Sequence, residues 1–182
     1  MTSISRLSTE DFRGCVSGLA DLLVDAVGDG SSLGFREPFD RAAAEAWWQA
    51  REAVVAAGRL IVWVARGADG IAGTVSLALE EKPNGRHRAD IVKLMVHRTA
   101  RGRGLGRALL GVAEQGAAQF GASLMLLDTE SGSAAEYLYH SAGWTRYGVV
   151  PGYAADPAGV LQDCSFFYKR LGNGMHETTL AD

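Results

Sequence analysis

From residue 96 to residue 107 the chain reads Val96-His97-Arg98-Thr99-Ala100-Arg101-Gly102-Arg103-Gly104-Leu105-Gly106-Arg107. An apolar strand pattern ending at Leu94-Met95-Val96 leads into this run, and a helical pattern begins near Gly104. The glycines let the backbone approach a ligand closely, while free N–H groups and the positive end of the helix dipole attract an anion. The run therefore predicts a phosphate-binding loop.

Two common nucleotide-binding loops do not fit this run. A dinucleotide-binding loop needs GxGxxG, but counting from Gly102 the last position is Arg107, and the run follows a β-meander instead of opening a βαβ repeat. A P-loop fails as well, because no GK[ST] is present. The structural alternative is a tight turn with solvated basic residues.

Helical patterns dominate the chain before the meander. Ser8 and Asp11 resemble a capping box, and apolar residues recur at helical spacing until Gly28. After the Gly- and Ser-rich loop 29–39, a second helix is predicted from Asp40 as N-cap toward Ala57, ending at Gly58.

The middle of the chain has the period of β-strands. Strands are predicted at 60–65, 71–79 and 89–97, joined by turns at 67–70 and 82–85. This spacing predicts an antiparallel meander, which a short strand at 3–7 flanks.

The pattern downstream of the glycine run alternates between helix and strand. A helix at 104–119 and an apolar strand at 123–128 follow the third meander strand, so a right-handed crossover and a parallel strand pair are expected. A short helix at 133–142 and strands at 144–150 and 164–169 complete the domain.

Composition narrows the class of protein. The 182 residues, 47% hydrophobic, predict a single domain at 1–171 and a polar, flexible tail at 172–182. A net charge of -3 argues against nucleic-acid binding. The sequence shows no signal peptide or membrane span, so a cytoplasmic protein is expected. The cysteines and histidines lack ligand spacing, which predicts no metal.

Two motifs resemble those of the GNAT superfamily of N-acetyltransferases. They are V-x-x-x-x-R-G-x-G-x-G from Val96, and Tyr139-His140-Ser141-Ala142-Gly143-Trp144, which is similar to the superfamily's Y-x-x-x-G-[FW] element. The resemblance implies an α+β (α/β) fold with a twisted mixed sheet of six to seven strands flanked by about four helices. This sheet would be splayed between the strands at 89–97 and 123–128. Many members have proline where this chain has Arg98.

The same resemblance implies acetyl-CoA as cosubstrate. Backbone groups of Leu94 and Val96, with Met95 between them, would bind pantetheine in the splay, and the pyrophosphate would lie on the loop residues Arg101, Gly102, Arg103, Gly104, Leu105, Gly106 and Arg107. Narrower likenesses in several loops point to members that acetylate a small, amino-acid-like toxin or antibiotic. The acceptor is thus expected to be the amine of a small molecule.

Acetyl transfer needs an acid, a base and an oxyanion site. Tyr139 has the acid's role in the family, although a packed tyrosine is the structural alternative. Asp128, ending the apolar strand, is the candidate base, with Glu130 as fallback; a cap for the 131–133 turn is the alternative for Asp128. A backbone N–H near Val96, freed by a bulge, would face the oxyanion, as in the family.

For the acceptor pocket, the most informative residue in the sequence is Lys93. Lys93, taken to share a face with Ile91 and Met95, must find an anion, either a structural carboxylate such as Glu80 or the substrate's own carboxylate. If Lys93 and a carboxylate both reach the pocket, the acceptor is zwitterionic.

Further residues of the acceptor pocket are predicted, and alternative functions are kept beside the main one. Phe35, Glu81 and Tyr153 are predicted to line the acceptor pocket, while core packing is favoured for Trp63. A protein or peptide acetyltransferase, a catalytically silent acyl-CoA-binding module, and a homodimer through the final strands stay open as alternatives.

Overall fold

The computed structural model describes residues 3–172. Its elements are β1 (Ser3–Arg6), α1 (Thr9–Gly28), α2 (Arg41–Gln49), α3 (Glu52–Ala56), β2 (Leu60–Gly67), β3 (Gly70–Leu79), β4 (Arg88–Val96), a 3-10 turn (Arg98–Ala100), α4 (Leu105–Gln119), β5 (Leu124–Glu130), α5 (Ala134–Ser141), β6 (Thr145–Ala155) and β7 (Leu161–Arg170). Apart from Gly172, the predicted tail lies outside the described residues.

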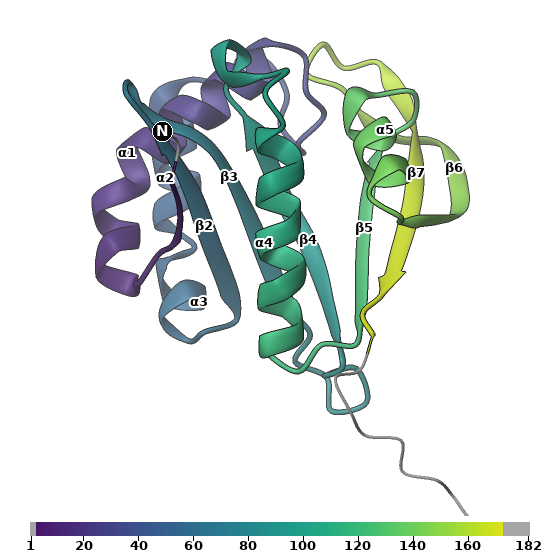
Figure 1. The fold of residues 1–182 in the computed structure, drawn as a ribbon. Helices are drawn as coiled ribbons and strands as arrows, with labels where there is room; N and C mark the ends of the chain where they lie inside the picture. The colour runs from purple at the N-terminus through teal and green to yellow at the C-terminus, as the bar shows by residue number, and fades with distance from the viewer. Residues whose placement is uncertain (1–2, 173–182) are drawn as a thin grey trace, which may run out of the picture.

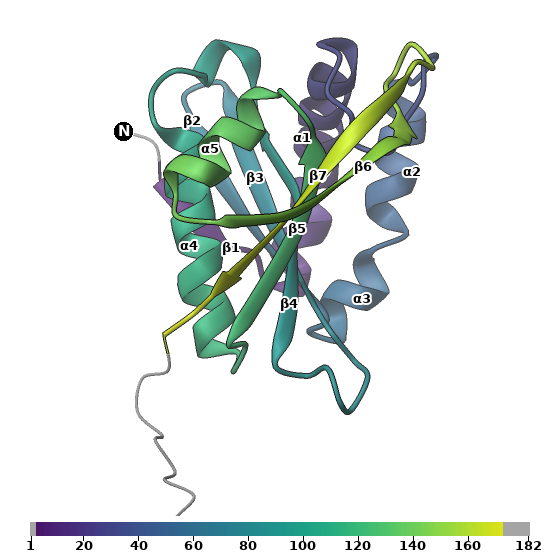
Figure 2. The same cartoon turned by 90° about the vertical axis from the view of Figure 1, so that its right-hand side faces the viewer.

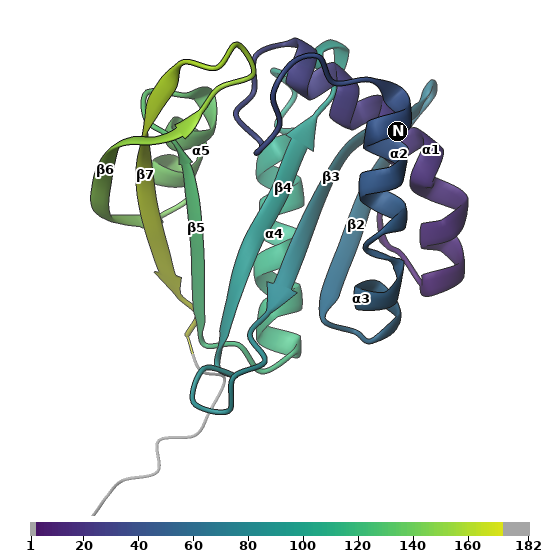
Figure 3. The same cartoon turned by 180° about the vertical axis from the view of Figure 1, so that it is seen from behind.

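The strands form one seven-stranded mixed sheet in the order β1-β2-β3-β4-β5-β7-β6. Every neighbouring pair is antiparallel except β4 and β5, which confirms the predicted meander and parallel pair. β4 and β5 pair only where residues 88–90 meet residues 124–126. Beyond that point they diverge, and Figures 1 and 3 show the V-shaped gap between them.

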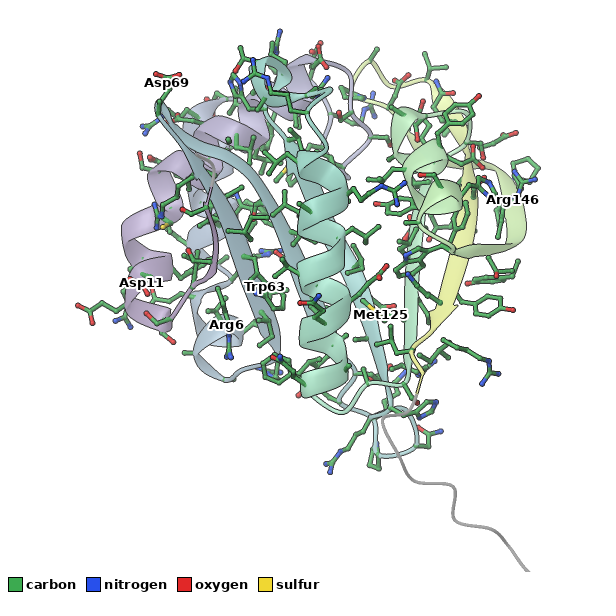
Figure 4. The ribbon with its side chains drawn as sticks, viewed as in Figure 1. Arg6, Asp11, Trp63, Asp69, Met125 and Arg146 are labelled. Carbon is green, nitrogen blue, oxygen red and sulfur yellow. The ribbon has the colours of Figure 1, made fainter. Side chains whose placement is uncertain are left out.

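Helices cover both faces of the sheet. α4 and α5 lie on the face seen in Figure 1, and α1, α2 and α3 lie on the opposite face, seen in Figure 3. Each face has its own buried cluster of apolar side chains. Trp63 lies beside α4 (Figure 4) and is 5% exposed, which confirms core packing for this residue. The two covered faces hold β4 and β5 in place on either side of the gap.

The sequence prediction of a single helix over 40–57 is wrong. The chain forms two shorter helices that separate at Ala50 and Arg51. α2 is anchored on α1, where Trp48 is fully buried and its Nε1 donates to the Leu19 carbonyl at 3.1 Å. α3 contacts α1 and β2. The two helices have different tertiary partners, and a helical periodicity in the sequence does not record such contacts.

The last strands are longer than predicted. β6 runs to Ala155 and β7 begins at Leu161, so their hairpin extends beyond the apolar residues that marked it in the sequence. The β6–β7 register shifts between Val150 and Ala154, around Pro151 and Gly152. Backbone pairing continues through exposed side chains there, which is why a hydrophobic pattern underestimates the strands.

Candidate active site

A cleft of about 860 Å³ occupies the gap between β4 and β5. Its walls come from the α1–α2 loop, the end of β4, the start of α4, the end of β5, α5 and the β6–β7 hairpin. The predicted site residues that line it are Lys93, Leu94, Met95, Val96, Arg101, Gly102, Gly104, Leu105, Gly106, Arg107, Asp128, Glu130, Tyr139 and Tyr153. Arg103, Phe35 and Glu81 are not among the lining residues.

The start of α4 presents backbone amides to the cleft. Gly102 and Gly104 have φ angles of 75° and 76°, a left-handed conformation that favours glycine. Gly104 is the N-cap and supplies no side-chain cap, and the first helical hydrogen bond runs from the Ala108 N–H to the Gly104 carbonyl at 3.0 Å. The preceding helical amides therefore stay free for an anion.

The arginines of this loop are mostly engaged with protein groups. Arg101 pairs with Asp29, and its Nε donates to the Val96 carbonyl at 3.1 Å. Arg107 donates to Ser141, with its Nη2 2.6 Å from the hydroxyl oxygen. An anion at this end of α4 would therefore meet chiefly backbone N–H groups, because Arg101 and Arg107 already donate to protein groups.

Arg98, which stands where many superfamily members have proline, ties this loop to α1. Its Nε lies 2.5 Å from Oδ1 of Asp25, and its backbone N–H donates to Oδ2 at 3.1 Å. His97 Nε2 lies 3.5 Å from the same carboxylate. Sequence reasoning missed this cluster because 73 residues separate Asp25 from Arg98.

β4 contains the expected bulge. The β3–β4 register shifts between Thr74 and Ser76, and Lys93 has a φ of 53°, unusual for a residue with a Cβ. The extra residue changes the alternation of the strand, so Ile91 and Met95 belong to opposite apolar clusters. The expectation that Lys93 shares one face with both of them is therefore wrong.

Tyr139 reaches the cleft from α5. Its ring packs against Trp144 and Phe167, and the residue is 5% exposed. Although the ring is buried, the side chain lines the cleft. Burial raises the pKa of Tyr139 well above its usual range, and the nearby charge of Asp128 raises it further.

Asp128 lies on β5, on the same side of the cleft as α5, and its charge reaches Tyr139. Its side chain is exposed, and the Cys164 thiol donates to its Oδ2 at 3.4 Å. The capping alternative for Asp128 is wrong, because its carboxylate accepts from Cys164 and not from the 131–133 turn, while Ser133 caps α5 by accepting from the Glu136 N–H. Glu130 also lines the cleft, and burial, followed by the charge of Asp156, raises its pKa.

The predicted acceptor residues separate into two groups. Tyr153 lines the cleft, and Phe35 packs beneath Lys93, whose Nζ is 5.2 Å from its ring centre. Glu81 instead pairs with Arg59 at 2.7 Å, at the start of β2 and far from the cleft end of β4. Its assignment to the pocket is wrong, because β3 runs antiparallel to β4 and carries its last residues away from the gap.

The structure adds lining residues that sequence reasoning missed. They are Ser31 and Ser32 on the α1–α2 loop, and Gln162, Asp163 and Cys164 on the β6–β7 hairpin. These two segments also touch: the Glu37 N–H donates to the Pro157 carbonyl at 2.9 Å. Figures 2 and 3 show them side by side. In the sequence, only the α1–α2 segment was marked as a loop, by its Gly and Ser content.

The family model of the acetyltransferase (GNAT) family matches residues 21–144, more than half of the chain. The chain belongs to this acetyltransferase family. As a member it is an enzyme of the acyltransferase class, and acetyl-CoA is the acetyl donor of this family.

Solved structures share the fold over nearly the whole chain. Salmonella typhimurium yncA, assigned as an acetyltransferase and solved with its cofactor acetyl-CoA, has 22% identity and a TM-score of 0.74, covering 96% of both chains. A ribosomal-protein-alanine N-acetyltransferase from Brucella melitensis has 23% identity and a TM-score of 0.73, covering 93% of this chain and 99% of its own. A protein assigned as a phosphinothricin N-acetyltransferase has 16% identity and a TM-score of 0.76, covering 95% and 100%. At these identities the likeness establishes the GNAT fold.

Neither a membrane-spanning helix nor a metal-binding group of side chains occurs in residues 3–172. None of the helices described has the length and apolar character needed to cross a bilayer. In the same residues, no three His, Cys, Asp or Glu side chains gather in a group suited to a metal ion. A reaction without a metal stays a prediction.

Proposed function

We propose that the protein transfers the acetyl group of acetyl-CoA to the amine of a small molecule, with Asp128 as general base and Tyr139 as general acid. The observation that carries this proposal is that Tyr139 and Asp128 line the same cleft, close enough for the charge of Asp128 to raise the pKa of Tyr139. The free amides at the start of α4 suit the pyrophosphate of CoA. The β4 edge near Leu94 and Val96 suits its pantetheine.

The chemistry follows from these positions. Asp128 accepts a proton from the ammonium of the acceptor, directly or through water, and the neutral nitrogen attacks the thioester carbonyl. A backbone N–H freed by the bulge at Lys93 stabilises the oxyanion. When the intermediate collapses, the C–S bond breaks and Tyr139 donates its proton to the departing sulfur. The acetylated nitrogen then releases its extra proton, directly or through water, to the tyrosinate, which restores the phenol.

The raised pKa of Tyr139 makes this donation costlier than an ordinary phenol would, because a thiol has a pKa of about 8.5. Protonation of Asp128 lowers part of that cost. Its negative charge is one of the two causes of the raised Tyr139 pKa, and it disappears once Asp128 holds the acceptor's proton. Uptake of the proton by the base thus strengthens the acid at the step that needs it.

A small acceptor is favoured over a peptide by the contact between the α1–α2 loop and the β6–β7 turn. The Glu37–Pro157 hydrogen bond and the packing of the Arg36 guanidinium against Gly159 join the two sides of the cleft. An extended peptide would need an open groove there. Loop similarities to the tabtoxin resistance protein, at Ser32-Leu33-Gly34-Phe35 and Pro151-Gly152-Tyr153 among others, support an amino-acid-like toxin as acceptor.

The test is release of CoA thiol from acetyl-CoA in the presence of a panel of small amines and peptides. We expect turnover with a small amine, and a fall in kcat of about 10²- to 10⁴-fold in Tyr139→Phe and in Asp128→Asn. Calorimetry should find the acetyl-CoA Kd nearly unchanged in Tyr139→Phe, which separates catalysis from binding.

Three results would contradict the proposal. Acetylated peptides as the sole products would favour the peptide enzyme. Acetyl-CoA binding without turnover of any amine would favour a silent acyl-CoA-binding module. Full activity in both variants would remove Asp128 and Tyr139 from the mechanism.

A further inference from the structure

Lys93 carries a partly buried positive charge at the wall of the cleft. Its Nζ donates to the Leu33 carbonyl at 2.6 Å and lies 5.2 and 5.1 Å from the ring centres of Phe35 and Trp47. Burial, and then the charge of Arg51, lowers the pKa of Lys93, while the charge of Asp128 opposes this. One carbonyl occupies one of the three N–H donors of an ammonium group.

No carboxylate neutralises this charge within residues 3–172. Neither Lys93 nor Arg51 forms an ion pair there. Glu80, the structural partner considered from the sequence, pairs with Arg88 at 3.0 Å instead. A buried charge is costly unless it is paired, and a second cation nearby adds repulsion. An anion at this wall would relieve both effects.

The two walls of the cleft carry opposite charges. Lys93 lies on the β4 wall, and Asp128 and Glu130 lie on the β5 wall. A ligand with a cation at one end and an anion at the other matches this pattern. Its ammonium would lie at Asp128, where the proposed reaction takes place, and its anion would lie at Lys93.

We propose that Lys93 binds a carboxylate of the acceptor, so that the substrate is an amine that also carries a carboxylate group. This inference rests on the proposed function. Arg51 strengthens the same field from the junction of α2 and α3 without lining the cleft. The rival role for Lys93 is purely structural, holding the α1–α2 loop to β4 through Leu33.

Matched substrate pairs separate the two roles. Initial rates of CoA release are measured for a panel of neutral amino acids and for the carboxamide of each, so that only the carboxylate changes. We expect the acids to have the higher kcat/KM by about 10- to 100-fold, the range of a charge-assisted hydrogen bond. In Lys93→Met, which keeps the chain length and the backbone strain, this ratio should fall to near one, whatever happens to the absolute rates.

Two further variants sharpen the test. Arg51→Gln should lower the acid-to-amide ratio by a smaller factor, because it acts at longer range. Lys82→Met removes a lysine from the remote β3–β4 turn and should leave the ratio unchanged.

The inference is overturned, with the proposed function intact, if amides are turned over as well as acids. It is also overturned if Lys93→Met lowers both rates by the same factor, since that is the signature of a loop support. Absence of turnover with every amine would instead remove the proposed function itself, and the inference with it.

Discussion

The protonation of Tyr139 depends on the charge of Asp128. Trp144 and Phe167 hold Tyr139 in an apolar setting, whereas Asp128 on β5 is exposed. Burial, followed by the negative charge of Asp128, raises the pKa of Tyr139. The Tyr139 pKa therefore reports directly on the charge of Asp128.

Replacing Asp128 with asparagine should lower the pKa of Tyr139, because a negative charge that raises it is removed. The pKa should stay above that of an ordinary tyrosine, since burial is the larger cause and remains. Titration of 13C-labelled tyrosine by NMR measures this, with Tyr139→Phe used to assign the signal. An unchanged or higher pKa would mean that the two groups do not interact.

Among the elements, α4 combines a ligand-binding end with a packing face. Its first turn offers amides to the cleft, while Gly116 near its other end lies against the Trp63 ring. A Cβ at Gly116 would come within 2.5 Å of the indole. Glycine at this position therefore lets α4 approach the Trp63 ring on β2 closely.

Gly116→Ala should therefore destabilise the protein by about 1–3 kcal/mol through overpacking. Gly111→Ala is the matched control in the same helix, because a Cβ there meets nothing within 4 Å. It should stabilise the fold by up to about 1 kcal/mol through helix propensity. Urea unfolding of both variants measures the difference, and equal stabilisation by the two alanines would show that Trp63 has room to move.

Element types were largely predictable from periodicity, and the splay was predictable from the family resemblance. The helix before Gly28, the meander and the β4–α4–β5 crossover all follow from apolar spacing and glycine positions. The break at Arg51 and the length of β6 were not predictable, because each depends on contacts with distant residues or on backbone pairing that side-chain polarity does not record.

At the scale of the whole molecule, Glu136 connects the elements of the cleft wall formed by α5, β6 and β7. Its carboxylate accepts from the Ser165 hydroxyl at 2.7 Å, from Arg146 at 3.1 Å and from the Gly132 N–H, which joins α5 to β6 and β7. These hydrogen bonds, led by that from Gly132, hold the pKa of Glu136 below its usual range. Tyr139 lies on the same helix, one turn after Glu136.

Glu136→Gln should cost about 1–3 kcal/mol of unfolding free energy at pH 7, because hydrogen bonds to a charged group are lost. A carboxyl whose folded pKa is lowered stabilises the fold above its unfolded pKa of about 4.3 and loses that effect as the pH falls through the folded pKa. The difference from wild type should therefore shrink below about pH 4.

Chemical denaturation between pH 3 and pH 7 tests this pH dependence. Glu81→Gln serves as the control, since its exposed pair with Arg59 should contribute less than about 1 kcal/mol throughout. A Glu136→Gln deficit that stayed constant across this range would show that the carboxylate charge is not what stabilises the wall.

The amino-acid sequence alone determined most of the order of elements and the glycine loop at the start of α4, because these depend on local periodicity and short motifs, and its resemblance to a family made Tyr139 and Asp128 candidates. Tertiary structure decided which charges are paired: Arg98 with Asp25, Glu81 with Arg59, and Lys93 with no carboxylate among the described residues. Pairing depends on distance in space, and chain folding brings together side chains whose separation in sequence carries no such information.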